Sequence, residues 1–146
     1  MLITCFVFAR LDYCNAVFAG LSRCDLDRLQ AVQNAAVKLV AEARQFDHVT
    51  PLLRERHWLP VQQRVTFKTA VIMYKCVHGM TADYLADYVR QPSSSAADMR
   101  LRSASSGRLF VPRARTAAGD RSFAVAGPRL WNSLPASVTS AGSVCV

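Results

Sequence analysis

The first 19 residues of the chain are largely apolar, which predicts a helix over this stretch. The helix is expected to end at Gly20, because glycine readily adopts the left-handed conformation found just after helices. Its longest apolar run, residues 1–9, stops at Arg10, well short of the ~18–20 residues that cross a bilayer. The stretch also lacks the basic start and cleavage site of a signal peptide. No contact with a membrane is therefore predicted.

A second helix is predicted from about residue 23 to Ala43, capped by Ser22 or Asp25. Its apolar residues recur at three- and four-residue steps and should face the core: Leu26, Leu29, Val32, Ala36, Leu39 and Val40. Gln33 lies at the margin of this stripe, and the opposite face is polar. The pattern predicts a helix that packs on one side only.

Proline and glycine divide the rest of the first 90 residues. Thr50 is a candidate cap for a short helix, with proline following at its first position. Pro60 is expected to open a longer helix that ends at Gly79, and Thr81 can cap a last one. The long helix is apolar on two sides, with a basic ridge between them that should reach the surface: Arg64, Lys68 and Lys75. Residues 1–90 are thus predicted to form a small helical bundle.

The composition changes after residue 90. Residues 91–108 are rich in serine and also contain Pro92 and Gly107, which is typical of a flexible linker. Residues 109–111 predict a short edge strand closed by Pro112, with residues 116–118 as its pairing partner. A helical turn broken at Gly127 should follow, then an apolar anchor up to 135, and residues 136–146 should form a frayed tail. The fold class is therefore mainly α: a helical bundle, a Ser-rich linker and a short α+β segment (109–135).

The distribution of charged residues along the chain indicates a candidate class of binding partner. The chain has 18 basic and 10 acidic side chains and a net charge of +8, and 15 of its basic residues are arginine. Residues 91–146 hold seven arginines against Asp98 and Asp120, a net charge of +5. An arginine-rich segment is typical of a surface that contacts a phosphate backbone, but a solvated basic face has the same composition. Composition alone does not distinguish a phosphate-contact surface from a solvated basic face.

The predicted strand would favour the phosphate-contact interpretation. Arg113 and Arg115 would share one face of it, close to Phe110, as in sheets that follow a nucleic acid. The alternative is an edge strand that its charges protect from pairing with other chains. The residues nominated for phosphate contact are Arg108, Arg113, Arg115, Arg121 and Arg129.

The sequence contains no motif that indicates an enzymatic activity. The chain has no phosphate-binding glycine loop, no nucleophile elbow and no metal-ligand spacing of histidine and cysteine, so no catalytic, cofactor or metal site is predicted. Five cysteines without a CxxC pair favour a reduced, intracellular protein. Four of them are expected to be small buried hydrophobes: Cys5, Cys14, Cys24 and Cys76. Trp58 and Trp131 are expected to be hydrophobic plugs at helix junctions.

Five ordered blocks resemble the region that follows the polymerase core in LINE-type (non-LTR) retrotransposon reverse transcriptases. They are RLDYCN at 10–15, LQAVQNAA at 29–36, FDHVTPLL at 46–53, HWLPV at 57–61 and RLWNSLP at 129–135. The resemblance covers almost the whole chain and implies a C-terminal fragment of an RNA-directed DNA polymerase.

The resemblance carries over no catalytic residue, because the family's polymerase aspartates and its endonuclease lie upstream of these blocks. It implies a non-catalytic fragment that contacts template RNA or target DNA. Two alternatives remain: a protein-interaction module that packs on the polymerase core, or a functionless translated remnant of an element.

Overall fold

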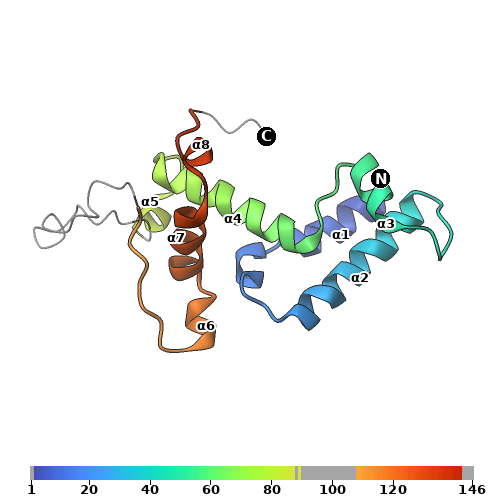
Figure 1. Ribbon diagram of the computed structural model, residues 1–146, viewed down its shortest axis with the longest axis horizontal. Coiled ribbons are helices and arrows are strands. Elements are labelled where there is room, and N and C mark those ends of the chain that lie inside the picture. The colour runs from blue at the N-terminus through green and yellow to red at the C-terminus, as the bar shows by residue number, and fades with distance from the viewer. Residues whose placement is uncertain (1, 88, 90–107, 143–146) are drawn as a thin grey trace, which may run out of the picture. The chain divides into compact units, whose positions relative to one another are not determined.

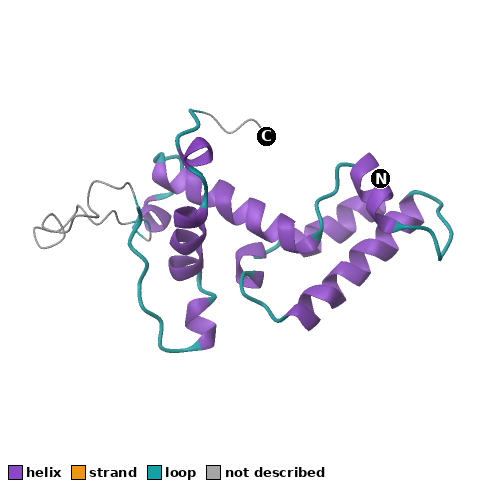
Figure 2. Ribbon diagram, in the orientation of Figure 1, coloured by secondary structure: helices purple, strands orange, loops and turns teal. Residues whose placement is uncertain are grey.

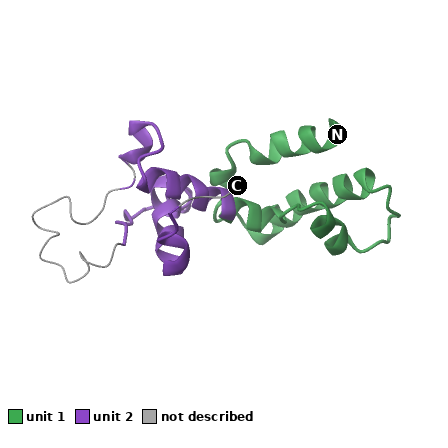
Figure 3. Ribbon diagram, turned by 90° about the horizontal axis from the view of Figure 1, so that it is seen from above, with its two compact units in different colours: residues 1–66 green, residues 67–146 purple. Residues whose placement is uncertain are grey.

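The computed structural model describes residues 2–87, 89 and 108–142, and all regular secondary structure in these residues is helical (Figures 1 and 2). The predicted mainly α class is therefore correct. The predicted linker, apart from Arg108, lies outside the described residues. The elements are α1 (Leu2–Asp12), the 3-10 helix η1 (Asn15–Phe18), α2 (Arg23–Val40), α3 (Val49–Glu55), α4 (Val61–Val77), α5 (Asp83–Ala86), α6 (Ala117–Asp120), α7 (Phe123–Ser133) and α8 (Ala136–Thr139). They fall into two compact units, residues 1–66 and 67–146 (Figure 3).

The first helix ends earlier than its apolar pattern predicts. α1 stops at Asp12, Cys14 takes a left-handed conformation (φ 50°), and η1 follows. The side-chain amide of the buried Asn15 donates a hydrogen bond to the Leu11 carbonyl at 3.0 Å. It thereby satisfies one of the carbonyls left open at the end of α1, so the helix can stop before the turn at Gly20.

α2 begins as predicted, and Leu26, Leu29 and Ala36 of its predicted apolar stripe lie at the core, but the stripe as a whole is not buried. The Ser22 hydroxyl accepts a hydrogen bond from the Asp25 amide, which confirms Ser22 as the cap. Gln33 is fully buried, whereas Val32 and Leu39 are 54% and 64% exposed. The expected apolar stripe is thus wrong at these two positions, because the helix turns the amide of Gln33 into the core.

The next two helices follow the proline and glycine signals closely. α3 starts at Val49 with His48 as its N-cap, so the predicted cap at Thr50 is wrong and Thr50 lies inside the helix. α4 starts directly after Pro60 and ends at Val77, and Gly79 adopts φ 66° as expected. The predicted cap of the last helix is wrong: Ala82 precedes α5, and it makes no side-chain cap.

The core of unit 1 centres on Leu11, Val61 and Val65, with apolar residues of α1, η1 and α2 packed around them. Trp58 packs edge-on against Phe8, with ring centroids 4.6 Å apart and planes at 82°. This position agrees with its expected role as a plug between helices.

Arg64 belongs to this packing and does not form a free basic ridge. Its guanidinium makes two hydrogen bonds of 2.6 Å to the Asp12 carboxylate and lies 4.1 Å from the centre of the Phe8 ring. The side chains of Arg64 and Asp12 are only 19% and 22% exposed.

Unit 2 has its own core, formed by Met73, Tyr74, Leu109 and Trp131. Trp131 is 5% exposed, so its predicted role as a plug is confirmed. A Cβ atom built on Gly127 would lie 2.6 Å from the Sδ atom of Met73. Only glycine therefore lets α7 approach α4 this closely.

The predicted α+β segment is wrong: the described part of residues 109–135 contains no strand, and its regular elements are the helices α6 and α7. The Thr116 hydroxyl accepts a hydrogen bond from the Gly119 amide and caps α6, and the Thr116 carbonyl accepts from the Asp120 amide, so this backbone begins a helix and does not pair as a strand. α7 also continues through Gly127 and Pro128, both of which are buried.

The predicted frayed tail is helical in part. Residues Ala136–Thr139 form α8, and the Tyr74 hydroxyl donates a hydrogen bond of 2.9 Å to the carbonyl of Ala141. This bond ties the end of the described chain to the core of unit 2. Residues 143–146 lie outside the described residues.

Candidate nucleic-acid interface

The candidate interface begins where Asn132 of α7 holds the extended segment that precedes α6. The Leu109 amide donates to the Asn132 Oδ1 atom at 2.9 Å, and the Asn132 Nδ2 atom donates to the Leu109 carbonyl at 2.9 Å. Leu109 itself is 4% exposed and lies in the core of unit 2. One side chain thus supplies both hydrogen bonds that a neighbouring strand would have given this residue.

Three of the five nominated arginines lie on the segment that this anchor positions. Arg108, Arg113 and Arg115 are exposed, and within the described residues none has a hydrogen bond or ion pair. No acidic residue occurs between 108 and 119, and Phe110 nearby is 56% exposed. We call residues 108–115 the arginine segment.

The arginine segment is not a strand. Arg113 and Arg115 were expected to share one face of a strand, but residues 108–114 have no regular secondary structure. The three arginines therefore form an exposed basic segment and not one face of a sheet.

The other two nominated arginines lie on the helical side. Arg129 of α7 donates a hydrogen bond of 3.1 Å to the Asp120 carboxylate, in an ion pair whose side chains are 59% and 49% exposed. Arg121 follows α6 and is half-buried. Of the five nominated arginines, three are therefore exposed without an acidic partner.

Metal-binding side chains do not cluster in the described part of the chain. No group of three or more histidine, cysteine, aspartate or glutamate side chains there could hold a metal ion. The described helices include none that could cross a membrane. Cys76 is buried as expected, but Cys5, Cys14 and Cys24 are exposed, because the surfaces of α1, η1 and α2 on which they lie remain uncovered.

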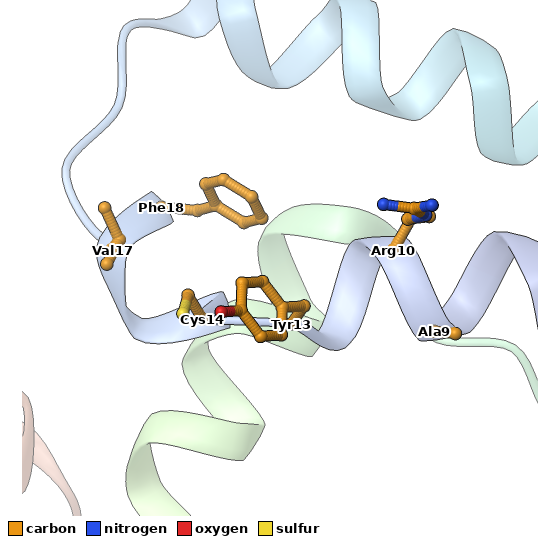
Figure 4. A pocket seen from close by; sticks show the side chains of 6 residues that line it. All are labelled: Ala9, Arg10, Tyr13, Cys14, Val17 and Phe18. Carbon is orange, nitrogen blue, oxygen red and sulfur yellow. The ribbon is translucent and has the colours of Figure 1, made fainter.

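A second candidate surface lies on α1 and η1. Leu2 and Phe6 of α1, and Tyr13 directly after it, are 87%, 68% and 76% exposed. Beside them Arg10, Tyr13, Cys14 and Phe18 line an open cavity of about 600 Å³ (Figure 4). Such an uncovered apolar surface is typical of a protein contact.

Comparison with known proteins yields no assignment: no family model, no curated protein and no solved structure matches this chain.

Proposed function

We propose that this chain is a non-catalytic C-terminal region of a LINE-type reverse transcriptase, and that its arginine segment contacts the sugar–phosphate backbone of RNA or DNA. The observation that carries the nucleic-acid role is the exposure of Arg108, Arg113 and Arg115 on a segment without acidic residues. Arginine presents a planar set of donors that matches phosphate oxygens, and the exposed Phe110 offers a ring on which a base can stack.

Three polar residues of the recognised blocks, Gln30, Gln33 and Asn132, form hydrogen bonds that hold the fold together, which supports a structural role for them. The Gln30 Oε1 atom accepts from the Val61 amide at 2.8 Å, and the Gln33 Nε2 atom donates to the Leu59 carbonyl at 2.9 Å. These bonds link block 29–36 to block 57–61. Asn132 in the last block anchors the arginine segment in the same way.

Binding to single-stranded RNA is expected to weaken steeply with salt. Each phosphate neutralised on a single strand contributes about −0.7 to the slope of log K against log salt concentration, so three arginines should contribute about −2. Replacing Arg108, Arg113 and Arg115 with glutamine should remove that share of the slope. Fluorescence anisotropy of a labelled single-stranded RNA at several salt concentrations measures it.

The matched control replaces Arg23, Arg28 and Arg44 with glutamine, which lowers the net charge equally at exposed positions of unit 1. This variant should keep nearly the whole slope. Equal losses in the two triple variants would mean that binding depends on net charge alone and would contradict the assigned segment.

A second function, a protein-interaction module, is favoured by the exposed residues Leu2, Phe6 and Tyr13. Without its partner such a face is expected to drive self-association at raised protein concentration. Replacing Phe6 with glutamine should reduce the mass measured by light scattering after gel filtration. Replacing Phe46, which is 91% exposed but lies outside this face, is the control and should change nothing. A wild-type chain that stays monomeric at every concentration would argue against this function.

A further inference from the structure

Three helices of this protein end in the same backbone motif, and only one of them uses glycine. After α2, α3 and α4 the left-handed position is taken by Glu42, His57 and Gly79, with φ of 51°, 55° and 66°. At His57 the two bonds of the motif run from its amide to the Arg54 carbonyl (3.0 Å) and from the Trp58 amide to the Leu53 carbonyl (2.8 Å). Glycine is the residue that fits this position without strain. The imidazole is therefore held here at a conformational cost that Gly79 avoids.

The motif places His57 at the edge of an open cavity of about 520 Å³ within unit 1. This volume is within the ~300–1,000 Å³ typical of ligand sites. Its polar and aromatic side chains come from α3, the turn after it and the start of α4: Thr50, Arg54, His57, Trp58 and Gln63. None of the residues that line the cavity is acidic.

The polar groups of this cavity are not used by the fold. Arg54, His57 and Gln63 are exposed, and their side chains make no hydrogen bond or ion pair within the described residues. Trp58, in contrast, is held in place, since its backbone is bonded to Leu53 and its ring packs against Phe8. The site thus combines a fixed aromatic ring with a free guanidinium, a free imidazole and a free amide.

We propose that this cavity binds one nucleotide of a single-stranded nucleic acid. The base lies against the half-buried Trp58 ring, Arg54 and His57 donate to the phosphate, and Gln63 and Thr50 meet the polar edge of the base. An aromatic ring beside cations is the usual arrangement for single strands, because stacking holds the base while the cations follow the backbone. An acidic peptide would use the cations but leave the ring and the amide without a role. The site lies in unit 1 and does not depend on the arginine segment of unit 2.

Two indole N–H signals make the test specific. Trp58 lines the cavity and Trp131 is buried in the core of unit 2. On titrating the full chain with a single-stranded oligothymidylate of about eight nucleotides, within the usual site sizes, the Trp58 signal should shift and saturate in a two-dimensional nitrogen–proton NMR spectrum. The Trp131 signal reports on unit 2, where the arginine segment packs through Leu109, so a shift there is counted separately from binding at Trp58. A Trp58 signal that stays in place while the oligonucleotide binds elsewhere would overturn the proposal and leave the arginine segment untouched.

Glycine substitutions at two of the left-handed positions, His57 and Glu42, give a test variant and its matched control. His57→Gly removes the imidazole and relieves the backbone, so a loss of affinity cannot be attributed to unfolding. It should weaken binding measured at Trp58 about tenfold, as should Arg54→Gln, the effect of one lost charge-assisted hydrogen bond. Glu42→Gly makes the same backbone change away from the cavity and should keep wild-type affinity. If polyglutamate shifted Trp58 as strongly as the oligonucleotide, the cavity would be a general anion site and the proposal would be wrong.

Discussion

Replacing Asn132 with leucine is expected to lower the free energy of unfolding by about 2–4 kcal/mol. Leucine has a similar shape but can neither accept from the Leu109 amide nor donate to its carbonyl. Because Leu109 is 4% exposed, both backbone groups would lose their partners without gaining water. Each unsatisfied buried group costs about 1–3 kcal/mol. Urea denaturation followed by the fluorescence of the neighbouring Trp131 measures the change.

Two variants separate the parts of this effect. Asn132→Asp keeps an acceptor for the Leu109 amide but cannot donate to its carbonyl, so it should fall between wild type and leucine. Ser133→Ala, at an exposed position on the same turn of α7, should change stability by no more than about 0.5 kcal/mol. An unchanged midpoint for Asn132→Leu would show that the segment is not anchored through this side chain.

The anchor also has a consequence for binding. Asn132 carries no charge, yet it fixes the start of the segment that carries Arg113 and Arg115. Asn132→Leu should therefore weaken RNA binding at a given salt concentration while leaving the number of basic residues unchanged.

Helix boundaries could be predicted where a local signal decides them. Ser22 caps α2 and Pro60 precedes α4 as expected, because capping bonds and proline geometry involve residues a few positions apart. Gln33 was placed at the margin of the core, since its own helix gives no reason to bury an amide. Its partner is the Leu59 carbonyl, 26 residues further along the chain.

The candidate site could be predicted only in part for the same reason: local features are visible in the sequence, whereas contacts between distant residues are not. The arginine-rich composition was visible in the sequence, and residues 109–111 have the composition of a strand. The bonds that a strand would need are instead made by Asn132, 23 residues away, so no sheet forms. The pairing of Arg129 with Asp120 depends likewise on how α6 meets α7, which spacing alone does not reveal.

Asp12→Asn is expected to lower the free energy of unfolding by about 2 kcal/mol. The Asp12 carboxylate accepts two hydrogen bonds of 2.6 Å from Arg64, a residue 52 positions away. Exposed ion pairs contribute about 0–1 kcal/mol, whereas removing one partner of a fully buried pair costs about 3–5 kcal/mol. With exposures of 22% and 19%, this pair lies between these limits. The loss leaves a charged guanidinium, which also lies over the Phe8 ring, without its carboxylate.

The exposed pair of Arg23 and Asp27 is the natural control for this prediction. It joins the same two residue types at 3.2 Å, but its side chains are 81% and 64% exposed. Asp27→Asn should therefore change stability by no more than about 0.5 kcal/mol in the same urea titration. Arg64→Lys should also be destabilising, because lysine keeps the charge but cannot form the two parallel bonds or lie flat on Phe8. If Asp12→Asn and Asp27→Asn had equal effects, the pair of Arg64 and Asp12 would behave as a surface pair, and the packing of α1 against α4 would rest on its apolar residues alone.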